Sequence, residues 1–120
     1  MNRTFDKFTF MNEVILGDKV LLKQLVTLFL RKYPEGMDGM ERALAGKDLR
    51  EIEHAAHSLK NLVGNFFANK ALELSERLET GVRGGSLEGA DDIWHQLKPE
   101  MHLLRDDLKK LLEDNSGTDA

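Results

Sequence analysis

Apolar residues return every three or four positions along most of this chain, which is the spacing of an amphipathic helix. No stretch keeps the alternation of apolar and polar residues that a half-buried strand requires. The most regular stripe lies near the C-terminus and comprises Leu87, Ala90, Trp94, Leu97, Met101, Leu104, Leu108 and Leu111. Such a seam is typical of a helix packed nearly parallel or antiparallel to its neighbours. The chain is therefore predicted to be all-α.

Start and stop signals divide the first half of the chain into a short helix and a long one. The short helix covers residues 5–15, and Asp18 is expected to cap the second helix, which ends at Gly46. Pro34 lies inside this second helix and removes one backbone donor. We therefore predict a kink or a break near Tyr33.

The second half of the chain carries signals for three more helices. Asp48-Leu49-Arg50-Glu51 has the form of a capping box and starts a third helix, which runs to about Phe66. Asn69 is expected to cap a fourth helix, which Gly84-Gly85 closes, and Ser86 is expected to open the last. Long helices with short connections favour an antiparallel four-helix bundle, to which the short N-terminal helix is added.

Length and composition limit the class of protein. A chain of 120 residues with 41% hydrophobic and 32% charged residues is typical of one soluble globular domain. We expect a single helical domain over residues 1–114 and a flexible tail over 115–120. No apolar run is long enough for a membrane span or a signal peptide, so a cytoplasmic location without a membrane partner is expected. The net charge of −4 argues against nucleic acid as a partner, and the filled stripes suit a monomer.

The third predicted helix carries a histidine away from its apolar side. His57, Lys60, Asn61 and Gly64 are spaced to lie along one strip. The apolar residues of the same helix form a second strip, Leu49, Ile52, Ala56, Leu59, Val63 and Phe66. At 100° per residue the mean directions of the two strips differ by roughly 130°. His57 is therefore predicted to face water while its helix stays anchored in the core.

An exposed histidine at this position can act as a nucleophile. A free imidazole has a pKa of ~6.5, is mostly neutral at pH 7, and can accept a phosphoryl group on its lone pair. Lys60 would supply a mobile positive charge, and Gly64 would leave room for a bulky group or a partner's backbone, at a cost of roughly 1 kcal/mol in helix stability. A solvated helix face without a function also carries His and Lys at this spacing by chance. These residues alone leave both interpretations open.

Around this histidine the chain resembles the histidine-containing phosphotransfer (HPt) domains of bacterial two-component phosphorelays. That family has an alanine, the phosphorylated histidine, any residue, leucine, lysine and usually glycine, followed by a small-residue segment that often ends in glycine-asparagine. The matching residues here are Ala56, His57, Leu59, Lys60, Gly64 and Asn65. The resemblance continues outside the motif and covers about residues 5–112.

The resemblance implies a carrier that takes a phosphoryl group from the aspartyl phosphate of one receiver domain and passes it to another receiver. His57 would be the phosphoacceptor, and Lys60 would offset the phosphate charge. Gly64 would permit close approach of the receiver. From their positions beside His57 on the outer side of the helix, Asn61 and His54 are also expected to belong to the receiver docking surface, with simple exposure as the alternative for His54. No cofactor is expected on this chain, because the Mg²⁺ belongs to the receiver. The carrier would have no kinase activity of its own, and it would be free-standing or part of a larger histidine kinase.

Two residues depart from the family pattern and keep an alternative open. Asn61 stands where the family usually has glycine, so its side chain either crowds the receiver or donates a hydrogen bond to the phosphoryl group. Phe67 replaces another common glycine near the end of the helix and is expected to reshape a turn. The alternative is a degenerate helical adaptor that binds a receiver or kinase domain without being phosphorylated.

A metal-binding bundle is the least favoured interpretation. Glu51-Ile52-Glu53-His54 and Asp92-Ile93-Trp94-His95 resemble the Glu-x-x-His pairs of di-iron bundles, whose ligands point into the core. In this chain the acidic residue and the histidine of each pair lie on the outer side of the predicted helix. No metal site is therefore expected.

Overall fold

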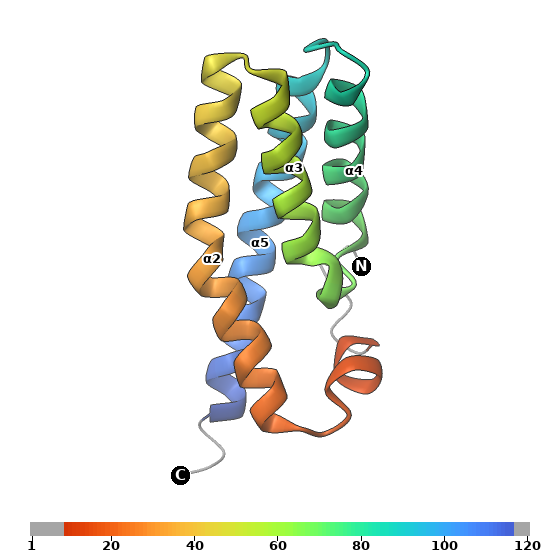
Figure 1. Cartoon of the computed structure of the whole chain (residues 1–120). Helices are drawn as coiled ribbons and strands as arrows, with labels where there is room; N and C mark the ends of the chain where they lie inside the picture. The colour runs from red at the N-terminus through yellow and green to blue at the C-terminus, as the bar shows by residue number, and fades with distance from the viewer. Residues whose placement is uncertain (1–8, 117–120) are drawn as a thin grey trace.

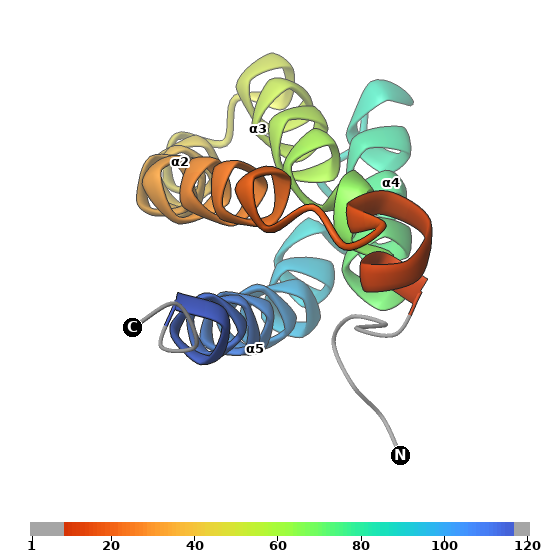
Figure 2. The same ribbon diagram turned by 90° about the horizontal axis from the view of Figure 1, so that it is seen from below.

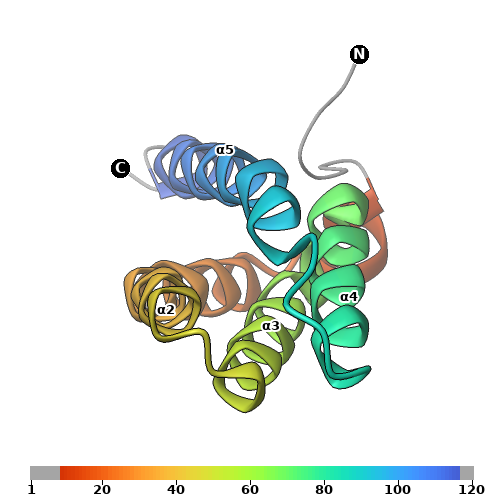
Figure 3. The same ribbon diagram turned by 90° about the horizontal axis from the view of Figure 1, so that it is seen from above.

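The computed structural model describes residues 9–116, and these form helices and turns without a strand (Figure 1). Four long helices run up and down in an antiparallel bundle. They are α2 (Lys19–Gly46), α3 (Leu49–Val63), α4 (Asn69–Arg83) and α5 (Ala90–Ser116). Each helix packs against the next along the chain, and α5 closes the ring against α2 (Figure 3). The predicted all-α four-helix bundle is confirmed.

The short N-terminal helix is present as η1 (Phe10–Ile15), a wide turn with a hydrogen bond from the N–H of Leu16 to the carbonyl of Met11. It lies beside the end of α3, where it contacts α2 and the 3₁₀ turn η2 (Gly64–Phe66) (Figure 2). The rings of Phe10 and Phe66 pack with their centroids 5.0 Å apart. The predicted residues 5–8 of this helix lie outside the described part of the chain.

The predicted apolar stripes fill the core. On α5 every stripe residue from Ala90 to Leu111 is buried. Leu87 is the exception at 38% exposure, because α5 begins after it. On α3 the buried residues are Ile52, Ala55, Ala56, Leu59 and Val63. The core therefore takes one side of α3 and leaves the other side free for the site.

Two of the predicted helix starts are correct. The Asp18 carboxylate accepts a hydrogen bond from the backbone N–H of Leu21 and caps α2. The Asp48 carboxylate accepts from the N–H groups of Arg50 and Glu51 at 3.0 and 3.2 Å and caps α3. These caps need only the residues of the first helical turn, which explains why local spacing predicts them.

Two other predicted starts are wrong. Asn69 is the first residue inside α4 and makes no cap, because the capping position falls on Ala68. The last helix begins at Ala90 rather than after Ser86, because the positive φ of Gly89, 79°, interrupts the helical backbone. The Ser86 hydroxyl instead accepts a hydrogen bond from the N–H of Glu88 within the turn.

Pro34 does not break α2, which runs from Lys19 to Gly46 without interruption, but the helix bends, and its axis changes direction along its length in Figure 1. The buried stripe continues through Tyr33 and Met37 on either side of the proline. Packing of this stripe against the neighbouring helices holds the helical backbone across the missing hydrogen bond.

Helices α2 and α5 are nearly twice as long as α3 and α4. The described part of the chain measures 51 × 25 × 19 Å along its principal axes. Helix α5 extends to Ser116, two residues into the predicted tail, and residues 117–120 lie outside the described part. The domain limits of 1–114 stay a prediction. None of the described helices is long and apolar enough to cross a membrane.

Candidate functional site

His57 lies in the middle of α3 with 52% of its side chain exposed. The neighbouring Ala56 and Leu59 are fully buried and anchor the helix in the core. The outward direction predicted for this histidine is therefore confirmed, and its backbone is held by packing on the opposite side.

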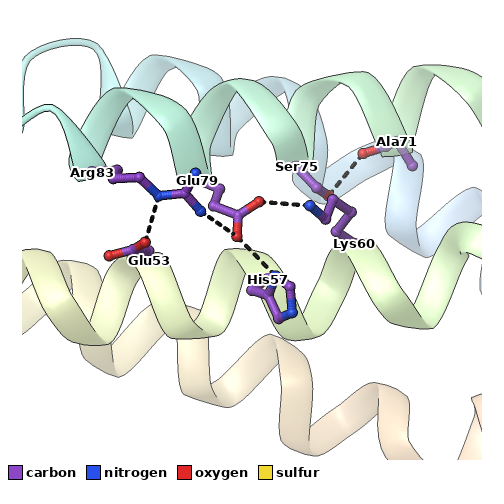
Figure 4. A network of polar contacts seen from close by, with 7 residues as sticks. All are labelled: Glu53, His57, Lys60, Ala71, Ser75, Glu79 and Arg83. Atoms are coloured by element: carbon purple, nitrogen blue, oxygen red, sulfur yellow. Dashed lines mark hydrogen bonds and ion pairs between the residues drawn. The ribbon is translucent and has the colours of Figure 1, made fainter.

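A buried carboxylate from α4 contacts the histidine (Figure 4). Oε2 of Glu79 lies 2.8 Å from Nδ1 of His57, and Oε1 of Glu79 accepts a hydrogen bond from Nζ of Lys60 at 2.9 Å. Arg83, one turn further along α4, donates from Nη2 to Oε2 of Glu79 at 3.0 Å. The Glu79 side chain is only 5% exposed, so three nitrogen groups converge on a carboxylate that is shielded from water.

The network returns to α3 through Arg83, whose Nε donates to Oε2 of Glu53 at 2.8 Å. Glu53 and His57 are four residues apart and face α4 from the same side of α3 (Figure 4). The two helices are thus joined at the site by polar contacts as well as by the core.

Glu79 is held in its ionised form. The hydrogen bond from Lys60 has the largest effect and lowers the pKa of the Glu79 carboxyl below its ordinary value. Burial acts in the opposite direction, and the contact with His57 lowers the pKa further. A carboxylate that is ionised can only accept hydrogen bonds.

The ionised Glu79 decides which nitrogen of His57 carries the proton. Because the carboxylate only accepts, Nδ1 of His57 donates, and in the neutral ring Nε2 then holds the free lone pair. No residue within 9–116 is hydrogen-bonded to Nε2, and in Figure 4 this side of the ring points away from Glu79. The site therefore presents one nucleophilic nitrogen to solvent.

Lys60 differs from the mobile cation that we expected. Its side chain is 28% exposed and its Nζ is tied to Glu79. The Lys60 side chain extends from α3 towards α4, because its ammonium group pairs with the buried carboxylate of Glu79. Its positive charge stays within the site, but it is positioned rather than free.

The three predicted docking residues all lie on accessible surface. Gly64 is exposed, and a Cβ built on it would meet no atom within 4 Å, so the fold itself does not require glycine there. His54 and Asn61 are exposed and line a groove between α2 and α3 that Gly36 and Gly39 leave open. Gly64, His54 and Asn61 are therefore exposed within two helical turns of His57 along the chain.

Phe67, the second departure from the family pattern, follows η2 with a φ of 55°. This left-handed conformation is one that glycine adopts without strain. The Phe67 side chain is half-buried and packs against the core. The residue ends the turn after α3, as expected.

The two Glu-x-x-His pairs lie on the outer surface, as predicted. Glu51, His54, Asp92 and His95 are all exposed. Within residues 9–116 no group of three or more His, Asp or Glu side chains is placed to hold a metal ion.

Glu79 and Arg83 are site residues that the motif did not identify. A signal for Glu79 was present, since Ser75 and Glu79 are the two polar residues that share the buried side of α4 with its apolar stripe. A charged residue on a core-facing position needs a partner. The spacing within α4 does not tell which helix supplies that partner.

Comparison with known families agrees with the all-helical fold. The Hpt domain family matches residues 24–114, which is most of the chain, and the chain belongs to this family. It is a histidine phosphotransfer domain of two-component phosphorelay signalling.

Among solved structures, the chain is similar to the crystal structure of histidine-containing phosphotransfer protein B (HptB) from Pseudomonas aeruginosa PAO1. The TM-score is 0.82 at 21% sequence identity, and the match covers 95% of this chain and 98% of the other. At this identity the likeness establishes a shared fold. No curated protein sequence matches the chain significantly.

Proposed function

We propose that His57 takes a phosphoryl group from the aspartyl phosphate of a receiver domain and passes it to the aspartate of a second receiver. The observation that carries the proposal is the exposed Nε2 of His57, whose lone pair is made available by the hydrogen bond between Nδ1 and Glu79. Membership of the Hpt family supports receiver domains as the partners.

In the forward step, Nε2 of His57 attacks phosphorus, the N–P bond forms, and the acyl P–O bond breaks. The aspartate of the receiver leaves as a carboxylate. Phosphoryl transfer depends mainly on in-line positioning and on the offset of negative charge. Glu79 orients the ring, and the ammonium group of Lys60, held near the ring by the same carboxylate, offsets part of the phosphoryl charge.

The docking role of His54, Asn61 and Gly64 is part of this proposal. The open space around Gly64 supports close approach of a receiver backbone, and the exposed Asn61 amide can reach a partner or the phosphoryl group. We propose no cofactor on this chain, with Mg²⁺ supplied by the receiver, and no kinase activity of its own. The cytoplasmic location and the monomeric state stay predictions.

Transfer of label from a receiver tests the proposal. A receiver domain from the same organism, carrying radioactive phosphate on its aspartate with Mg²⁺ present, is mixed with the wild-type chain. We expect acid-labile, base-stable label on the chain. His57→Gln should remove the label, whereas the matched control His95→Gln, at an exposed histidine of α5, should keep it.

The outcomes separate the alternatives. A chain that binds the receiver but never carries label is an adaptor, and this result would overturn the carrier proposal. Label that persists on His57→Gln would move the acceptor to another residue. Circular dichroism of both variants shows that they are folded, since exposed substitutions usually change stability by about 0.5 kcal/mol or less.

A further inference from the structure

The negative charge of Glu79 needs an explanation beyond orientation of the ring. A neutral amide at this position could also accept a hydrogen bond from Nδ1 of His57. A buried carboxylate is costly unless it is paired, and here Lys60 and Arg83 pair with it. The chain thus keeps a charged hydrogen-bond acceptor at a position where an uncharged acceptor would be sufficient to orient the ring.

The charge becomes important once the ring is phosphorylated. In its neutral, nucleophilic form the ring of His57 has one proton, on Nδ1, and one lone pair, on Nε2. When Nε2 bonds to phosphorus, the ring either keeps the Nδ1 proton and becomes a cation, or loses it to water and becomes neutral. In the second case the lone pair of Nδ1 would face Oε2 of Glu79 across the present contact of 2.8 Å, and two acceptors at that distance repel.

We propose that Glu79 retains the Nδ1 proton of His57 throughout the cycle, so that the phosphoryl group is carried on an imidazolium ring. This inference rests on the function proposed above. No proton then moves in either direction of transfer. When the next aspartate attacks, the N–P bond breaks and the ring leaves as neutral imidazole. A ring without the Nδ1 proton would have to leave as an imidazolide anion, which is a much poorer leaving group.

The neighbouring charges keep Glu79 in this role. Lys60 from α3 and Arg83 from α4 favour its ionised form, so the carboxylate accepts from Nδ1 instead of removing the proton. Glu53 from α3 balances Arg83. The two carboxylates and two cations around the ring cancel in net charge, and Glu79 is the charged group in direct contact with Nδ1.

The protonation of the phosphorylated ring tests the inference directly. ¹⁵N-labelled wild-type chain and Glu79→Gln are phosphorylated with phosphoramidate, and ring ¹H–¹⁵N correlation spectra are recorded across pH. We expect the phosphorylated wild-type ring to keep its Nδ1 proton to a pH about 1–3 units higher than the Glu79→Gln ring, as an opposite charge in contact would cause. The midpoint of each protein is the pH at which half of its phosphorylated rings have lost the Nδ1 proton. Equal midpoints in the two proteins would overturn the inference and leave the carrier proposal intact. A wild-type chain that accepts no phosphoryl group from phosphoramidate or a receiver would overturn both.

The rate of back transfer supplies a second measurement. At a pH above both midpoints we expect Glu79→Gln to return its phosphoryl group to a receiver about tenfold more slowly than wild type for each pH unit between the two midpoints. At a pH below both midpoints the two rates should converge. A residue that only orients the ring would change the rate equally at every pH, and that result would also contradict the inference.

Two further variants test whether the effect is specific to the charge of Glu79. Glu41 is a control carboxylate that is more exposed than Glu79. Trp94 and Lys98 bind it at 3.0 and 2.8 Å in a contact between α2 and α5, and Glu41→Gln should leave the ring of His57 unchanged. Arg83 is 59% exposed, so Arg83→Gln is expected to fold. Lys60 still keeps Glu79 ionised in this variant, and the repulsion between Arg83 and the ring cation is gone, so the midpoint of the phosphorylated ring should shift upward, opposite to Glu79→Gln. A downward shift or no shift would count against the inference.

Discussion

Glu79 joins the residues of the site because its two carboxylate oxygens bind His57, Lys60 and Arg83. Three charged or polar contacts on one shielded carboxylate are worth more than surface ion pairs, since water competes less for them. The same residue therefore links the reactivity of the histidine to the stability of the packing between α3 and α4.

This link predicts how acid affects the fold. The pKa of Glu79 is lower in the folded chain than its ordinary value of 4.5, chiefly through Lys60, so its contribution to stability is present above that value and is lost as the pH falls through the lowered one. Urea unfolding of the wild type should therefore show a decline in the free energy of unfolding as the pH falls below 4.5, and this decline should be smaller in Glu79→Gln. Parallel declines in the two proteins would show that Glu79 makes no such contribution.

Three helical segments within residues 9–116 end on left-handed residues that are not glycine. Leu16, Lys47 and Phe67 have φ values of 53°, 55° and 55°. At Lys47 the backbone N–H donates to the carbonyls of Ala43 and Leu44 and closes α2. The geometry of the turn, rather than the preference of the residue, decides the backbone conformation there.

Lys47→Gly should therefore stabilise the chain by about 0.5–1 kcal/mol, because glycine adopts this conformation without the Cβ penalty and loses part of that gain through its freer unfolded state. Lys47 is exposed, so the substitution removes no packing. Lys47→Ala keeps the Cβ and should give no comparable gain. Chemical denaturation of the three proteins checks the difference, and a destabilised Lys47→Gly would be inconsistent with this account of the turn.

The bundle brings α2 and α3 together at a glycine. A Cβ built on Gly36 would lie 3.0 Å from Cδ2 of Leu59, whereas one built on Gly39 would meet nothing within 4 Å. Leu59 is fully buried, so its methyl group has little room to move. Gly36 thus permits the close approach of the helix that carries His57.

Alanine at these two positions separates helix propensity from packing. Gly39→Ala should raise the free energy of unfolding by about 0.5–1 kcal/mol, because alanine favours the helix. Gly36→Ala has the same gain in propensity but must displace Leu59, so it should be less stable than Gly39→Ala by about 1 kcal/mol or more. Equal stabilities in thermal or urea melts would mean that the helices separate without cost.

Much of the bundle followed from residues close together in the chain. The helices, their apolar stripes, the caps at Asp18 and Asp48 and the outward direction of His57 were all predicted, since each depends on residues within about one or two helical turns. The misplaced start of α5 also has a local cause, because the left-handed Gly89 interrupts the helix after Ser86.

The partners of His57 depended on the packing of whole helices. Glu79 lies 22 residues further along the chain, and Arg83 lies 30 residues from Glu53. Spacing within α3 or α4 sets which side each residue occupies, but the contact between them depends on the rotation and height at which the two helices pack. Those are decided jointly by the buried side chains of every helix in the core, which is why a histidine could be predicted to face water while the carboxylate that controls its proton was found only in the folded chain.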